Sequence, residues 1–204
     1  MKLFTGIVLL LCVACGNKED ILLPKADKSI VKEVVDLSPI YIFFRTKDKD
    51  TLAEVNRNNS IGTTNWVLNI DKRIPLRLVI PEVIKLQAKK SGDGTHKNIA
   101  AQNYYSYADS IGKNLAFLPF TMIHYKIEKP ASGVIVYFDK NNTILVNNKE
   151  AAKEDLEKYI KLTSAGDTVF YCFDKNMSFD AYINLKIFLR GIEWKFISNQ
   201  EFIY

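Results

Sequence analysis

Few of the residue types on which catalysis and metal binding depend occur in this sequence. The 204 residues include only two histidines and three cysteines. The sequence has no Gly-x-Ser-x-Gly or His-Glu-x-x-His motif and no phosphate-binding glycine-rich loop. No cysteines and histidines follow the spacing of metal ligands. We therefore expect no catalytic residue, no metal and no cofactor, and we favour a binding or scaffold protein over an enzyme.

The two histidines leave two enzyme-like alternatives open. His124 lies in a strand-like apolar segment, so a Ser-His-Asp site would have to be assembled from distant residues. Asp93 and His96 lie in a polar, glycine-containing loop and could bind a metal there. A solvated loop explains the same residues more simply.

Strong charge bias and long hydrophobic runs are also missing. The net charge of +5 comes from 28 basic and 23 acidic residues that alternate along the chain, so we expect no nucleic-acid partner. A composition of 48% hydrophobic and 25% charged residues is typical of a globular protein. The longest apolar run, residues 3–14, is shorter than the roughly 20 residues of a transmembrane helix and matches the core of a signal peptide.

The end of this run resembles the lipobox of bacterial lipoproteins. The run Leu11–Gly16 places a small residue before Cys15, which in that family is acylated and becomes the new N-terminus. The resemblance implies a signal peptide over 1–14, a lipid anchor at Cys15 and a place in the cell envelope. Gly16 stands where Asp would retain a lipoprotein in the inner membrane, so we expect the outer membrane, at its periplasmic face or at the cell surface. A secretory signal or a short buried helix is the alternative.

Residues 15–38 are interpreted as the lipidated cysteine and a tether. The segment is rich in charge, and as a coil it would span roughly 25–30 Å. Its apolar residues Ile30, Val31, Val34 and Val35 could instead form a short helix or dock on the body.

The first half of the body, 39–130, combines strand and helix patterns. We expect strands over 40–44 and 66–70 and a helix over 76–88 that Pro81 either kinks or restarts. We also expect a helix over 98–111 that carries three tyrosines, and an extended segment over 117–126. Tyr104 and Tyr105, with Tyr107 and the cations upstream, could bind a ligand, but core positions explain them better.

The second half, 131–204, has a sharper pattern. It predicts strands over 134–138 and 143–146 around an Asp-Lys-Asn-Asn turn, a helix over 150–162 and a strand over 168–173. Ser178 is expected to cap a helix over 179–190, before a last strand over 194–197. The expected fold is α+β, a two-layer, mixed β-sheet backed by helices. Cys172, in the apolar strand, is expected to be a core residue.

Residues 134–197 resemble the periplasmic domain of the ExbD/TolR family. The resemblance rests on a strand ending in Asp139, a tight turn, a strand ending in Asn147 and a later strand ending in Asp174. It continues with Tyr182 in a helix and a glycine before the last strand. Asp139 and Asp174 are therefore candidate partner-binding residues, although turn residues at strand ends often have no other role.

Two departures limit what this resemblance implies. The transmembrane helix with its proton-relaying Asp, found in that family, is replaced here by a lipobox and tether, so the proton relay does not carry over. Asn142 stands where the family has a glycine in the first turn. Residues 39–130 could be a diverged repeat, in which 66–70 and 76–88 correspond to 143–147 and 151–162.

The sequence thus predicts a lipid-anchored envelope protein that binds or scaffolds, with an ExbD/TolR-like second half. Its expected partners are energy-transduction proteins of the motor or TonB type, or peptidoglycan, whose negative charge a basic protein suits. An envelope hydrolase with a dispersed site and a surface lipoprotein that captures nutrients are the alternatives.

Overall fold

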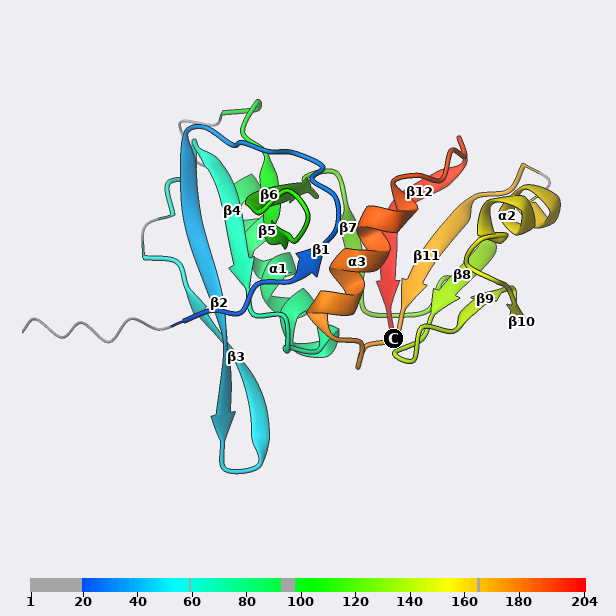
Figure 1. Cartoon of the computed structure of the whole chain (residues 1–204), viewed down its shortest axis with the longest axis horizontal. Coiled ribbons are helices and arrows are strands. Elements are labelled where there is room, and N and C mark those ends of the chain that lie inside the picture. The colour runs from blue at the N-terminus through cyan, green and yellow to red at the C-terminus, as the bar shows by residue number, and fades with distance from the viewer. Residues whose placement is uncertain (1–19, 59, 93–97, 165) are drawn as a thin grey trace, which may run out of the picture.

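The fold is α+β, and the described residues form two mixed β-sheets and three helices (Figure 1). The structure is a computed structural model that describes residues 20–58, 60–92, 98–164 and 166–204. The first sheet contains β1 (Lys25–Ala26), β2 (Leu37–Lys47), β3 (Asp50–Asn56), β4 (Asn65–Ile70), β5 (Asn103–Asp109) and β6 (Asn114–Pro119). Helix α1 (Leu76–Ser91) connects β4 to β5.

The second sheet is formed by β7 (His124–Lys126), β8 (Val134–Phe138), β9 (Ile144–Val146), β10 (Lys149–Glu150), β11 (Val169–Phe173) and β12 (Ile197–Ile203). Helix α2 (Leu156–Ser164) precedes β11, and α3 (Phe179–Leu189) follows it. β7 comes from the stretch 39–130 but pairs in parallel with β12, so the second sheet begins before residue 131. No helix in the described parts of the chain is long and apolar enough to cross a bilayer.

The two sheets share one topology. In the first, β2 pairs antiparallel with β3 and parallel with β4, and β4 pairs parallel with β5. In the second, β8 pairs antiparallel with β9 and parallel with β11, and β11 pairs parallel with β12. The helix between the last two of these strands is α1 in one half and α3 in the other. Among the described residues of the first half, no helix corresponds to α2.

This shared topology corrects the expected register of the repeat. The sequence suggested a possible repeat in which residues 66–70 and 76–88 match 143–147 and 151–162. By strand order and direction, β4 and α1 instead match β11 and α3. The local sequences agree with the new register, because Asp71-Lys72 after β4 corresponds to Asp174-Lys175 after β11.

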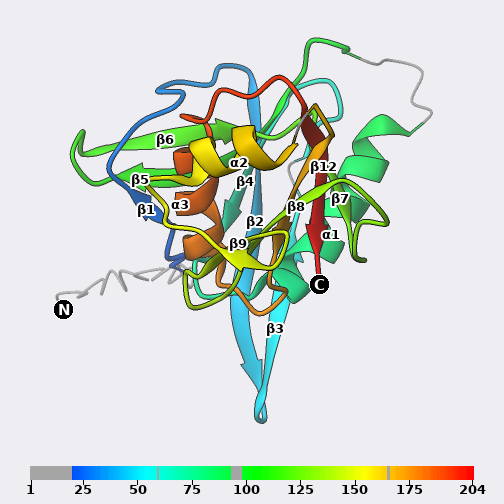
Figure 2. The ribbon, with the colours of Figure 1, turned by 90° about the vertical axis from the view of Figure 1, so that its right-hand side faces the viewer.

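Helices α1 and α3 lie between the two sheets, as Figures 1 and 2 show. Tyr182 of α3 packs edge-on against Tyr105 of the first sheet and against Phe173 of the second. α1 contacts β3 on one side and β7 and β12 on the other. Each sheet therefore has its own helix, and both helix layers fill a single hydrophobic core.

The loops that lead into α1 and α3 cross and bind each other through their backbones. Pro75 and Ser178 form an isolated antiparallel bridge. Four hydrogen bonds surround it in matched pairs: Leu76 N–Met177 O (2.9 Å) with Phe179 N–Ile74 O (2.9 Å), and Arg77 N–Lys175 O (2.7 Å) with Asp180 N–Lys72 O (3.0 Å). For each hydrogen bond that the first loop donates, the second loop donates an equivalent one, so the two loops are related by pseudo-two-fold symmetry.

The prediction of a helix over 98–111 is wrong, because this segment contains strand β5. Tyr104, Tyr105 and Tyr107 favour extended structure, and β5 pairs with β4 on one side and β6 on the other. A strand paired on both sides buries residues on both faces, so its apolar pattern does not alternate cleanly and imitates part of a helix.

Other predicted elements agree better with the structure. Residues 76–91 form one helix that contains Pro81, and Ser178 caps α3 by accepting a hydrogen bond from Ala181 N at 3.2 Å. Asn142 has a φ of 68°, the left-handed conformation expected of the β8–β9 turn. The last strand lies later than expected, at Ile197–Ile203.

The described part of the expected tether lies on the body. β1 pairs with β5. Val31 forms a bridge with Phe117, with backbone hydrogen bonds of 3.1 and 2.8 Å. The hydroxyl of Tyr107 accepts a hydrogen bond from Ile30 N and donates one to Lys28 O, each at 2.8 Å. Residues 24–31 are thus docked on the body, which was the alternative to a free coil.

Candidate functional site

The residues singled out from the sequence do not gather at one place. Cys15 lies outside the described residues. Tyr104 is half-buried on β5, edge-on to Phe117 at 6.5 Å between ring centroids, whereas Tyr105 is fully buried and stacks on Phe120 at 3.8 Å. The two tyrosines point to opposite faces of the first sheet, so they do not form one aromatic surface.

Asp139 and Asp174 follow neighbouring strands of the second sheet, and each closes a turn. Asp139 accepts hydrogen bonds from the backbone N–H groups of Asn141 (2.7 Å) and Thr143 (2.9 Å). Asp174 accepts one from Asn176 N at 2.7 Å. These bonds account for both carboxylates as turn residues.

Cys172 is buried in β11. Burial raises the pKa of its thiol to about 12, so the reactive thiolate is scarce at neutral pH. This agrees with the expected core position.

A large pocket opens instead where α1, the first sheet and β7 meet. Its volume is about 1010 Å³. Described residues that line it include Trp66, Ile84, Gln87, Ala88, Lys89, Lys90, Asn98, Ile99, Asn103, Thr121, His124, Tyr125, Lys126 and Gln200. We call it the Lys90 pocket. It joins parts of the chain that are far apart in sequence, including β12 of the second sheet.

Lys90 is a half-buried cation in the wall of this pocket. Its ammonium group donates hydrogen bonds of 2.9 Å to Gln102 O and to Asn103 Oδ1. It also lies over the ring of Trp66, 5.2 Å from the centroid, which favours a cation. Burial nevertheless lowers the pKa of Lys90 to about 8, because the charged form loses hydration.

The charged residues that line the pocket all carry the same sign. Among the described lining residues these are Lys89, Lys90 and Lys126, and no aspartate or glutamate lines the cavity with them. In the described ranges Lys90 has no carboxylate at ion-pair distance. The described lining residues therefore present positive charge and no counter-ion.

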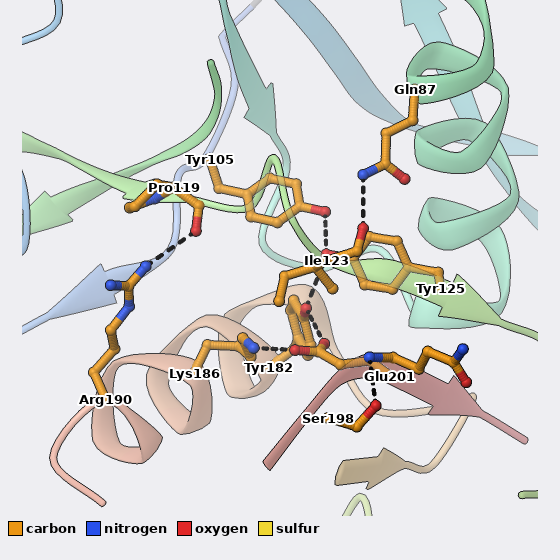
Figure 3. Close-up of polar contacts among 11 residues, drawn as sticks. Gln87, Tyr105, Pro119, Ile123, Tyr125, Tyr182, Lys186, Arg190, Ser198 and Glu201 are labelled. Atoms are coloured by element: carbon orange, nitrogen blue, oxygen red, sulfur yellow. Dashed lines mark hydrogen bonds and ion pairs between the residues drawn. The ribbon is translucent and has the colours of Figure 1, made fainter. Parts of the chain in front are cut away.

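The wall of the pocket is held in place by a buried chain of hydroxyl groups (Figure 3). The hydroxyl of Tyr125, a lining residue on β7, lies 2.8 Å from that of Tyr105 and 3.1 Å from that of Tyr182. Tyr182 donates to Glu201 Oε2 at 2.7 Å, and Lys186 forms an ion pair with the same carboxylate. The chain thus connects β5, β7, α3 and β12 behind the pocket.

A second contact fixes the entry to β7. The amide of Gln87, on the pocket side of α1, donates a hydrogen bond of 2.9 Å to Ile123 O (Figure 3). The start of β7 is therefore tied to α1, and its middle residue to the hydroxyl chain.

In the described parts of the chain, no group of three His, Cys, Asp or Glu side chains is arranged to hold a metal ion. Asp93 and His96, the loop pair of the sequence analysis, lie outside those parts. His124, by contrast, is exposed on β7 and lines the Lys90 pocket.

Sequence reasoning missed the residues that define this pocket. Trp66 lies in a predicted strand and Lys90 just after the predicted helix over 76–88, but no local pattern indicates that they meet. Asn103 was assigned to a helix, and His124 and Gln200 become neighbours only through the pairing of β7 with β12. The two adjacent lysines at the end of a predicted helix, followed by Ser-Gly, were the one available signal.

No protein-family model, no curated protein and no solved structure matches this chain.

Proposed function

We propose that this chain is a lipid-anchored binding protein of the bacterial cell envelope, that it acts without catalysis, and that the Lys90 pocket holds its ligand or partner. The pocket carries this proposal. It combines a volume of about 1010 Å³, in the upper range of ligand-binding cavities, with a few polar groups directed from different elements. The lipobox-like run that ends at Cys15 and Gly16 supports the anchor.

The ExbD/TolR-like second half is part of the same proposal. The described order from β8 to β12 is strand, strand, helix, strand, helix, strand, with only the two-residue β10 added. This order agrees with the one that the resemblance implied. On this basis the proposed partners are motor or TonB-type proteins of the envelope, or peptidoglycan.

Membrane fractionation tests the anchor. The Cys15→Ala variant should leave the membrane fraction, because the acylated residue is absent, whereas Cys172→Ser should stay with the membranes. Recovery of Cys15→Ala in the membrane fraction would contradict the lipid anchor.

Co-purification tests the binding function. The tagged full chain is crosslinked gently in native membranes and purified, and mass spectrometry identifies what accompanies it. Motor or TonB-type proteins, or peptidoglycan fragments, are the expected companions. Their loss from a Lys90→Gln variant that still folds would assign the binding to the pocket. Capture that is identical in wild type and variant would remove the pocket from the proposal.

A further inference from the structure

We infer that the Lys90 pocket binds a ligand through a carboxylate group, with the Lys90 ammonium as its counter-ion. The inference rests on the proposed binding function and names the chemistry of the ligand. A carboxylate-bearing fragment of peptidoglycan is the source within the envelope that fits this chemistry.

The first argument is the missing counter-ion. The two acceptors of Lys90, Gln102 O and Asn103 Oδ1, are neutral, and they leave one of its three N–H groups for a ligand. Burying a cation without an opposite charge is unfavourable, and such groups concentrate at functional sites. A bound carboxylate would supply the missing charge.

The second argument comes from a pocket at the pseudo-equivalent place on α3. This cavity of about 600 Å³ is lined by Ile187 and Gly191 of the α3 end, where the Lys90 pocket has Ile84 and Ala88. It also contains lysines, but the acidic residue Asp27 is among its lining residues. The matched position thus contains its own negative charge, whereas the Lys90 pocket has none among its described lining residues.

The third argument favours a carboxylate over a phosphate. Phosphate sites usually combine several donors, such as an arginine fork or the N–H groups of a helix N-terminus. The described lining contains no arginine, and its helix end is the C-terminus of α1, whose partial negative charge disfavours a phosphate more than a singly charged carboxylate. A single free ammonium N–H suits a singly charged carboxylate.

The remaining lining groups suit the rest of such a ligand. The amides of Asn103 and Gln200 can bind hydroxyl and amide groups, as sugars and peptides carry, whereas that of Asn98 is bonded to Thr63 O and Ala100 N. Ile84 and Ile99 supply apolar surface. A cavity of this size accommodates a sugar with a short peptide.

The test measures binding of muramyl dipeptide, which carries one carboxylate, to the full chain purified from membranes in detergent. The matched ligand is the same compound with that carboxylate converted to an amide. Inorganic phosphate is the third probe. Isothermal titration calorimetry at pH 7 gives the affinity for each.

The protein variants isolate Lys90. Lys90→Gln keeps an N–H donor for Gln102 O and Asn103 Oδ1 but removes the charge. Lys85→Met removes one positive charge from an exposed position on the same helix, outside the pocket lining, and controls for net charge. Thermal unfolding confirms that each variant folds.

We expect the acid to bind and its amide to bind about 10- to 100-fold more weakly, which is the size of a hydrogen bond to a charged group. Lys90→Gln should lose a similar factor for the acid only, and Lys85→Met should bind as wild type does. Equal affinity for acid and amide, no binding of the acid, or tighter binding of phosphate would each overturn the inference. Envelope partners recovered by co-purification alongside any of these results would leave the proposed function standing.

Discussion

At the scale of single residues, a buried ion pair within the second half holds α3 on β12. Glu201 is 1% exposed and pairs with Lys186, while Tyr182 donates to its second oxygen. The carboxylate is thus satisfied on both oxygens. Removing one partner leaves the other charge buried and unpaired, which costs far more than an exposed ion pair would.

Glu201→Gln is therefore expected to lower the free energy of unfolding by about 3–5 kcal/mol. Lys186→Met should cost a similar amount, because the carboxylate then stays buried without its cation. The double variant should be clearly less unstable than the sum of the two, since neither charge is left alone. Urea unfolding measures all three, and additive effects would contradict the coupling.

Two glycines with similar backbones provide a second comparison. Gly133 has a φ of 95° and Gly166 a φ of 100°, a region that other residues avoid. A Cβ at Gly133 would lie 2.7 Å from Thr168 O and from the ring of Phe170, whereas one at Gly166 would meet nothing within 4 Å.

Gly166→Ala should therefore cost about 1–2 kcal/mol from backbone strain alone. Gly133→Ala should cost more, because β8 must also shift away from the backbone of β11. Thermal unfolding of the two variants separates the backbone strain from the cost of the close contact. Equal losses of stability would show that the contact at Gly133 relaxes freely.

At the scale of elements, the sequence predicted strands best where they are short, unbroken apolar runs rich in β-branched and aromatic residues. β8, β9 and β11 are such runs. β5 alternates its tyrosines with smaller and polar residues, so it lacks such a run, and its tyrosines were assigned to a helix. β3 went unnoticed because its exposed residues give no strong apolar pattern.

The pocket was beyond prediction for a different reason. Its walls meet through strand pairings between distant segments, as when β7 joins β12. The ammonium group of Lys90 contacts the ring of Trp66 and the side chain of Asn103, and neither residue is near Lys90 in the sequence. Periodicity predicts which residues are buried but not which of them become neighbours.

The cap of α3 allows a prediction at this scale. Ser178 accepts a hydrogen bond from Ala181 N, while its backbone forms the bridge to Pro75. Ser178→Ala should cost about 1 kcal/mol, because one N–H of the first turn loses its acceptor. Ser178→Asp, which restores an acceptor, should recover that loss in thermal unfolding. A loss that Asp does not repair would point to another cause.

At the scale of the whole molecule, the two halves are expected to unfold together. They share one core and exchange backbone hydrogen bonds between the loops before α1 and α3. Trp66 reports on the first half and Trp194 on the second. With Trp194→Phe and Trp66→Phe as single-tryptophan variants, fluorescence and circular dichroism should give coincident transitions within each variant. A fluorescence midpoint displaced from the circular-dichroism midpoint would show that one half unfolds first.

Alkaline pH should weaken the whole core. Burial raises the pKa of Tyr182 well above its ordinary value of 10.0, and the charge of Glu201 raises it further. The pKa values of Tyr105 and Tyr125 are raised in the same way. Above pH 10 the unfolded chain releases protons that the folded chain retains, so stability falls as pH rises. Tyr182→Phe should reduce this slope in urea unfolding, and an unchanged slope would contradict the assignment.

The crossing of the two loops also determines how the molecule would respond to mechanical tension. Leu22 O accepts a hydrogen bond from Lys72 N at 2.7 Å, and Lys25 N donates one to Asp180 Oδ1 at 3.1 Å. Lys72 belongs to one crossing loop, and Asp180 begins the helix that follows the other. A pull applied at residue 20 would therefore be divided between both halves before it reached either sheet, and the molecule would resist it as one body.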